Sequence, residues 1–178
     1  MKVIAMIVSL VMVITAVILV SFVLASPTLA STKIAFLEVY EHGKLVQYEP
    51  GSRFGHSAMQ IGNAKNNLWL QSYPDEGVKL ITWRELNSRG KVAAILEIPV
   101  DVTEAQIKPF IGKPFDFDYT WSDDAFYCSE LLGKILQIPP EPMHFNHAVW
   151  PKWYWSKEGT PGLSPDGIYQ YLKQKYSL

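Results

Sequence analysis

An uncharged apolar run over residues 3–24 separates the start of the chain from everything that can fold as a globular domain. The run follows one basic residue and leads into small residues that suit signal-peptide cleavage before Ser26 or Ser31. It is also long enough to cross a bilayer as an uncleaved anchor. We therefore predict a signal peptide or N-terminal membrane anchor over residues 1–30. One exported domain is expected over residues 31–178, in the periplasm or another extracytoplasmic space, with membrane association where the segment is retained.

The exported domain must hold together without an internal disulfide, because Cys128 is the only cysteine. Roughly 150 residues are enough to bury a self-sufficient core. Lys2 is the only charged residue before Ser31, so the domain is slightly more negative than the formal charge of −1 of the whole chain. A nucleic-acid partner needs a basic surface and is therefore not expected.

Alternating apolar and polar residues predict an antiparallel sheet. His56, Ala58 and Gln60 fall on one face of a predicted strand, and the residues between them fall on the other. A turn cluster over residues 62–67 and a returning strand over residues 68–73 complete a hairpin. Further strands are expected over residues 34–40, 77–83 and 92–100.

Capping signals predict helices after this sheet. Thr103 and Gln106 form a capping box that opens a short helix. Another helix follows Cys128, with an apolar face that includes Leu131 and Leu132. Ser164, followed by proline, opens a C-terminal helix. The predicted fold class is α+β, an antiparallel sheet packed against a few helices.

Cys128 and His56 form the pair of residues that a cysteine nucleophile needs. The start of a helix favours the thiolate of Cys128, and His56 could accept its proton. Gln71 lies on the returning strand, roughly opposite the His56 region, and could fix the orientation of the imidazole. Backbone N–H groups at the start of the helix could stabilise an oxyanion. The neighbouring candidates for substrate or oxyanion contacts are Tyr127, Ser129 and Ser57.

The same residues also allow simpler interpretations. A free cysteine is often buried as a small hydrophobic residue. Asp123 and Asp124 suit the start of a helix, but negative charge near Cys128 would raise the pKa of its thiol. Glu130, in the first turn, is expected to be a helix-terminus charge rather than a catalytic acid.

Residues 112–132, which read Gly-Lys-Pro-Phe-Asp-Phe-Asp-Tyr-Thr-Trp-Ser-Asp-Asp-Ala-Phe-Tyr-Cys-Ser-Glu-Leu-Leu, resemble the signature of the YaeF/YiiX-type permuted papain-like enzymes, relatives of the NlpC-type cell-wall hydrolases. Gly-His-Ser-Ala-Met-Gln-Ile-Gly over residues 55–62 is similar to the histidine strand of that family. Residues 77–86 and 164–166 resemble its following strand and its C-terminal helix start. The resemblance implies a circularly permuted papain-like (NlpC-type) fold, in which the histidine strand precedes the nucleophile helix.

The resemblance also implies roles for individual residues. Cys128 falls on the nucleophile of the family and His56 on its general base. Gln71 falls where the family commonly has Glu or His, so it could orient His56 but would stabilise an imidazolium less. Pro50-Gly51-Ser52 stands where the family usually has Pro-Gly-Asp, so the acidic residue is missing here.

The leading hypothesis is an exported cysteine hydrolase that cleaves an amide or ester bond in a peptide or acyl-bearing small substrate through a thioacyl intermediate. Cell-wall peptides are the natural extracytoplasmic amide substrate, by analogy with the family. A lipid acyl hydrolase or transferase is the related alternative. The aromatic residues that could line its groove, sit at a membrane or pack in the core are Trp150, Trp153, Tyr154 and Trp155.

Two further classes of function stay open. A non-catalytic module that binds a peptide or an amino acid on the same scaffold is favoured by the uncharged Gln71. A metal site could use His144 and His147, joined by His42 or Cys128, but no carboxylate pattern accompanies this pair. No cofactor is expected.

Overall fold

The computed structural model describes residues 31–61 and 68–178. The predicted signal peptide or anchor and the predicted turn over residues 62–67 lie outside the described residues. Within the described ranges, no helix is both long and apolar enough to span a bilayer. The elements run in the order β1 (Thr32–Glu38), β2 (Tyr40–Glu41), β3 (Lys44–Leu45), β4 (His56–Gln60), β5 (Trp69–Tyr73), β6 (Gly77–Ile81), α2 (Trp83–Asn87), β7 (Lys91–Ile98), α3 (Glu104–Ile107), α4 (Cys128–Leu136), β8 (Glu141–Pro142), the 3-10 helix η1 (Lys152–Lys157), β9 (Pro161–Gly162) and α5 (Pro165–Tyr176).

Five strands form one antiparallel sheet in the order β6-β5-β4-β1-β7. The inner strand β1 is apolar on both faces, which suits a position between two neighbouring strands and between two packed layers. Ile34 lies opposite Met59 of β4 on one side and opposite Leu96 of β7 on the other. The predicted α+β class with an antiparallel sheet is therefore confirmed. The predicted strand over residues 34–40 is interrupted, because β1 ends at Glu38 and β2 starts a separate small hairpin at Tyr40.

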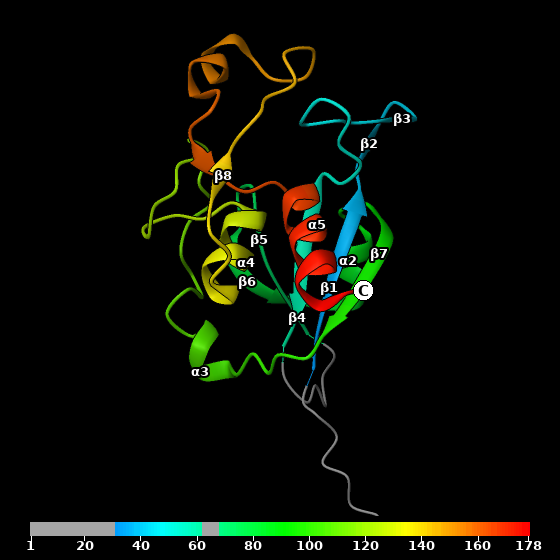
Figure 1. Cartoon of the computed structure of the whole chain (residues 1–178), viewed down its shortest axis with the longest axis vertical. Coiled ribbons are helices and arrows are strands. Elements are labelled where there is room, and N and C mark those ends of the chain that lie inside the picture. Colours follow the sequence, from blue (N-terminus) through cyan, green and yellow to red (C-terminus); the bar gives the residue numbers. More distant parts are fainter. Residues whose placement is uncertain (1–30, 62–67) are drawn as a thin grey trace, which may run out of the picture.

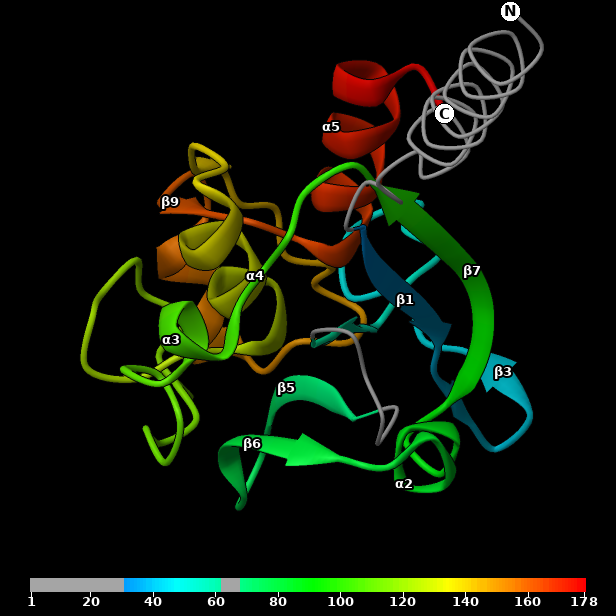
Figure 2. The same cartoon turned by 90° about the horizontal axis from the view of Figure 1, so that it is seen from below.

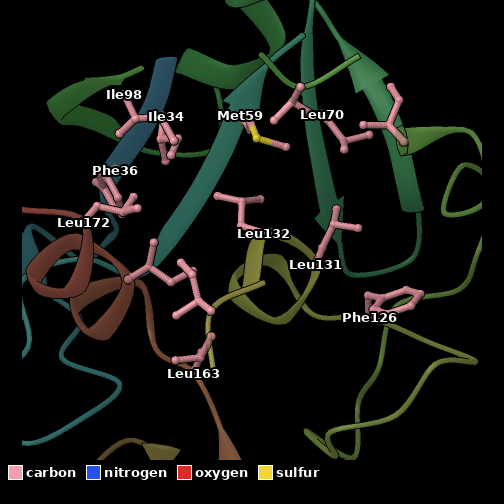
Figure 3. Packing of buried hydrophobic residues seen from close by; sticks show 14 of the residues in the cluster. Ile34, Phe36, Met59, Leu70, Ile98, Phe126, Leu131, Leu132, Leu163 and Leu172 are labelled. Atoms are coloured by element: carbon pink, nitrogen blue, oxygen red, sulfur yellow. The ribbon is translucent and has the colours of Figure 1, made fainter. Parts of the chain in front are cut away.

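Helices cover both faces of the sheet (Figures 1 and 2). Figure 2 shows α4 and α5 on one side of the sheet and α2 on the other. Leu131 and Leu132 of α4 pack toward Met59 and Leu70 of the sheet (Figure 3), in a core that also includes Leu172 of α5. A second, smaller core lies against α2 and consists of Ala35, Leu37, Ala58, Trp69, Ile81 and Leu86. Burial on both faces explains how the domain is stabilised without a disulfide.

Three helices, α2, α3 and α5, begin at residues that carry capping signals. Ser164 accepts a hydrogen bond from the Gly167 N–H and caps α5. The predicted capping box of Thr103 and Gln106 opens α3. A further capping box, formed by Thr82 and Glu85, opens α2. Local side-chain chemistry therefore fixes where these helices start.

Candidate active site

Helix α4 begins at Cys128 without a side-chain cap. Its N-cap residue is Tyr127, in an extended conformation with φ −86° and ψ 169°, and no side chain accepts from the first turn. The N–H groups of the first turn therefore keep donors that a Ser, Thr or Asp cap would otherwise take. Cys128 is half-buried at this positive end of the helix. The position suits both a thiolate and a neighbouring oxyanion.

His56 and Gln71 come from adjacent strands and meet through a buried hydrogen bond. His56 Nε2 lies 2.8 Å from Gln71 Oε1, and the two residues are 4% and 0% exposed. An amide oxygen only accepts hydrogen bonds, so Nε2 carries the proton and Nδ1 is left as the acceptor toward Cys128. The hairpin of β4 and β5 thus sets the tautomer of the imidazole.

The position of His56 also depends on the residue before it. Gly55 lies so close to Val39 and Tyr48 that a Cβ atom there would come within 2.8 Å of both side chains. A larger residue would push the start of β4 away from these neighbours. Glycine at position 55 therefore allows the start of β4 to pack closely against Val39 and Tyr48.

The surroundings of Cys128 have opposing effects on the pKa of its thiol. Burial raises the pKa of Cys128, but the charge and hydrogen bond of His56 lower it. The Ser57 backbone and the Ser129 side chain lower it further, so that the pKa lies below its ordinary value. The structure thus brings Cys128, His56 and Gln71 into one connected group, with a thiol of lowered pKa at its centre.

The three candidate oxyanion or substrate residues lie beside Cys128 but use different atoms. Ser57 contributes its backbone, and its buried Oγ has no hydrogen-bond partner among the described residues. Ser129 donates from Oγ to the carbonyl of Leu163 at 2.7 Å. The hydroxyl of Tyr127 accepts from the Leu163 N–H at 3.0 Å and donates to the sulfur of Met143 at 3.5 Å. The side chains of Tyr127 and Ser129 therefore hold α4 to the segment before α5.

A pocket with a volume of about 140 Å³ opens over the sulfur and the imidazole. Its aromatic wall includes Tyr119, from the segment before α4, and Trp150, from the segment between β8 and η1. At its polar end, burial raises the pKa of Glu49, although contacts with Ser164 and His144 oppose the shift. Burial likewise raises the pKa of Tyr119, Tyr127 and Tyr48, the last to about 12. These phenols stay neutral, so the wall is apolar with protonated hydroxyls.

The other predicted aromatic residues are divided between the pocket and the surface. Trp150 lines the pocket and donates from Nε1 to the carbonyl of Tyr48 at 2.7 Å. Tyr154 packs against Trp150, with ring centroids 4.7 Å apart. Trp153 is 70% exposed. Only part of the predicted aromatic groove therefore faces Cys128.

Glu130 differs from the prediction of a helix-terminus charge. Its side chain is fully buried and accepts from the Ser122 N–H at 2.8 Å. Burial raises the pKa of Glu130 to about 8, with a further contribution from Asp116. The residue is therefore mostly a neutral acid at pH 7 and holds the loop that precedes α4. The sequence correctly placed Glu130 in the first turn of the helix, but it did not predict that the side chain is buried.

The two histidines of the predicted metal pair contact different residues. His144 bonds through Nδ1 to Glu158 at 2.7 Å, and His147 stacks on Trp155 with centroids 4.2 Å apart. Among residues 31–61 and 68–178, no group of three or more His, Cys, Asp or Glu side chains is placed to hold a metal ion.

Comparison with known proteins gives consistent matches. Residues 34–144 match the model of a family described as permuted papain-like amidase enzyme, YaeF/YiiX, C92 family. The uncharacterized protein YiiX of Escherichia coli strain K12 is 32% identical over 101 residues, which are 53% of this chain and about half the length of that relative. A crystal structure described as metalloprotein YiiX from Escherichia coli O157:H7 has a TM-score of 0.58 at 20% identity and covers 79% of this chain and 91% of its own. The predicted resemblance and the predicted permuted papain-like fold are confirmed.

Proposed function

The chain belongs to the YaeF/YiiX, C92 family of permuted papain-like amidase enzymes, and we propose that it is a cysteine-dependent hydrolase that cleaves an amide bond in a small peptide-like substrate. Cys128 and His56 contact each other on the wall of a pocket, and His56 Nε2 bonds to the buried Gln71; this arrangement is the observation that supports the proposal most. A nucleophile, its base and the group that orients the base are the components that acyl transfer requires.

In the proposed reaction, His56 Nδ1 takes the proton of Cys128 and the thiolate attacks the substrate carbonyl. Backbone N–H groups in the uncapped first turn of α4 stabilise the oxyanion. The imidazolium then gives its proton to the leaving amine as the carbon–nitrogen bond breaks. Water activated by the same imidazole hydrolyses the thioacyl enzyme and regenerates the thiol.

The proposed place of the reaction is outside the cytoplasm, in keeping with the signal or anchor predicted over residues 1–30. Cell-wall peptides are the proposed amide substrates there. The E. coli structure described as a metalloprotein suggests a metal in that relative. The described residues of this chain do not supply a matching ligand set, so no step of the proposal uses a metal.

A second candidate is hydrolysis or transfer of a lipid acyl group. The specific observation in its favour is the aromatic wall of the pocket, where Tyr119, Phe145 and Trp150 pack against one another. An apolar wall next to the nucleophile suits a hydrocarbon chain as well as an apolar amino acid side chain. Matched peptide-amide and fatty-acyl ester substrates would separate these two classes.

The test begins with the pH dependence of alkylation of the full-length chain by iodoacetamide. Cys128 is the only cysteine, so labelling reports on this thiol alone. We expect a midpoint well below the free thiol value of about 8.5, and we expect the low midpoint to be lost in His56→Ala. Cys128→Ala should remain unlabelled and should lower hydrolysis of the active substrate by at least roughly 10³-fold.

Two results would contradict the proposal. An ordinary thiol midpoint in both proteins would indicate an idle cysteine, and a peptide- or amino-acid-binding module would then be the better description. Unchanged turnover in Cys128→Ala, at an unchanged melting temperature, would remove Cys128 from the reaction.

A further inference from the structure

Tyr73 gives His56 a second contact in addition to the hydrogen bond that His56 donates to Gln71. The rings of Tyr73 and His56 meet at 90°, with centroids 5.5 Å apart, and both residues line the pocket. Tyr73 is two residues after Gln71 on β5, so strand alternation places both side chains on the same face. One strand therefore supplies both the hydrogen-bond acceptor and the ring packing for the imidazole.

Arg89 supports Tyr73 from a distant part of the chain. Its guanidinium lies over the Tyr73 ring, with Cζ 4.2 Å from the centroid. Arg89 follows α2 and bonds through Nη2 to Glu76 at 2.5 Å, in the turn between β5 and β6. Its Nε is buried and has no hydrogen-bond partner in the described part of the chain. The guanidinium of Arg89 therefore interacts with the face of the Tyr73 ring as well as with Glu76.

The pairing of Arg89 with Glu76 affects how much positive charge lies near the imidazole of His56. A lone cation near the site would oppose formation of the His56 imidazolium. Here the carboxylate of Glu76 balances the guanidinium and also pairs with Lys79 at 3.1 Å. The packing of Arg89 on Tyr73 therefore restrains geometry, while the carboxylate of Glu76 offsets the positive charge of the guanidinium next to it.

A single hydrogen bond at Nε2 fixes one direction of the imidazole but leaves the ring free to tilt about that bond. We propose that Tyr73, clamped by Arg89 and Glu76, is a positioning residue that sets the ring plane of His56 so that Nδ1 faces Cys128. This inference rests on the proposed function, because it assigns a role toward the same Cys–His pair. Tyr73 packs on the imidazole and Arg89 packs on Tyr73, so both residues act through His56.

The experiment measures the pH dependence of Cys128 alkylation in the full-length chain and its variants. Tyr73→Ala should slow alkylation at pH 6.5 roughly tenfold and raise the midpoint, because the thiolate loses a well-placed imidazolium. Tyr73→Phe should restore wild-type behaviour, since it keeps the ring. Arg89→Met keeps an apolar stem over Tyr73 but cannot bond Glu76, and should slow alkylation about threefold. Lys79→Ala is the matched control, because it removes a partner of Glu76 that does not cover Tyr73, and it should match the wild type.

The outcomes separate this inference from the proposed function. An ordinary thiol midpoint in the wild type would overturn both. A low midpoint in the wild type that is unchanged in Tyr73→Ala and Arg89→Met would overturn the positioning role alone. If Tyr73→Ala does not fold, as judged by near-UV circular dichroism, the comparison of Arg89→Met with Lys79→Ala decides, and equal rates in these two would overturn the inference.

Discussion

In the described site, His56 donates from Nε2 to the amide oxygen of Gln71, while the amide nitrogen of Gln71 is buried without a hydrogen-bond partner. A neutral amide fixes the tautomer of the imidazole as a carboxylate would, but it adds no charge to stabilise the imidazolium. The unpartnered N–H also carries a desolvation cost. Gln71 therefore orients the imidazole of His56 but does not stabilise the positive charge of the imidazolium.

Substitution of Gln71 tests this division of roles. Gln71→Ala removes a hydrogen bond to a group that becomes charged, so kcat/KM should fall roughly 10- to 100-fold. Gln71→Glu keeps the acceptor, removes the unpartnered donor and adds a charge, so activity should persist and the alkaline limb of the pH profile should move upward by about one unit. Steady-state kinetics against pH measure both effects. Unchanged rates and pH profiles in both variants would show that Gln71 does not act on His56.

Individual residues could be predicted where chemistry and local spacing coincide. Cys128 is the only thiol and opens a helix, and the hairpin places Gln71 near His56. The roles of Tyr73 and Arg89 could not be predicted in this way. The cation–π contact between them joins β5 to the segment after α2, and such a contact leaves no periodic pattern in the sequence. Glycine before the histidine was a usable signal, since close backbone approach often requires it.

At the scale of the element, the first turn of α4 combines a reactive and a structural task. Cys128 faces the pocket, and Glu130 points into the interior, where it accepts from the N–H of Ser122 and from the Tyr127 backbone. An acidic residue at this position in the turn reaches back to the start of the helix, as in one half of a capping box. Burial keeps its proton bound, so the helix start is fixed largely without a negative charge beside the thiolate.

The raised pKa of Glu130 predicts a pH-dependent stability. Between the ordinary pKa of 4.5 and the folded-state pKa of about 8, the folded protein binds a proton that the unfolded chain has lost, so stability falls as pH rises through this window. Glu130→Gln mimics the neutral acid and should lack this loss, which amounts to at most about 1.4 kcal/mol per pH unit. The variant should match the wild type near pH 4 and exceed it by about 1 kcal/mol or more at pH 8.

Urea denaturation at several pH values measures this difference. Asp123→Asn is the control, because this carboxylate is on the same loop but is 87% exposed and paired with Lys134. The control should leave the slope between pH 5 and pH 8 unchanged. Parallel stability curves for the wild type and Glu130→Gln would show that Glu130 is ionised in the folded protein.

The elements that could be predicted are those with local signals. Capping residues gave the starts of α3 and α5, and alternation gave the β4–β5 hairpin. The position of β1 between β4 and β7 could not be predicted, because the pairing of β1 with β7 joins residues far apart in sequence and depends on tertiary packing. The loop before α4 carries Tyr119 into the pocket, and its irregular backbone has no periodicity to read.

For the whole molecule, the segment that leads to His56 is held by carboxylates from two other parts of the chain, the start of α5 and the end of β1. Asp166 in the first turn of α5 accepts from the backbone N–H groups of Arg53 and Phe54, the latter at 2.8 Å. Glu38 at the end of β1 accepts from Arg53 Nε at 2.7 Å and from Lys91 Nζ of β7 at 3.2 Å. A domain without disulfides thus uses carboxylates to tie its central sheet to the site.

Glu38 makes the acid stability of this arrangement testable. Its hydrogen bonds from Arg53 and Tyr40, opposed by burial, hold the pKa of Glu38 at about 2, below its ordinary value of 4.5. A lowered pKa contributes stability that is fully present above pH 4.5 and is lost as pH falls toward 2. Glu38→Gln should therefore be less stable than the wild type at pH 7, by about 1 kcal/mol because Arg53 and Lys91 are largely exposed.

The difference between the two proteins should shrink below pH 4.5 and vanish near pH 2, as measured by urea denaturation. Glu41→Gln, on the exposed strand β2, is the matched control and should follow the wild type. A deficit in Glu38→Gln that stays constant down to pH 2 would mean that the substitution acts through packing rather than through charge. Such a result would leave Asp166 as the carboxylate that fixes the approach to His56, because its hydrogen bonds reach the backbone of that segment directly.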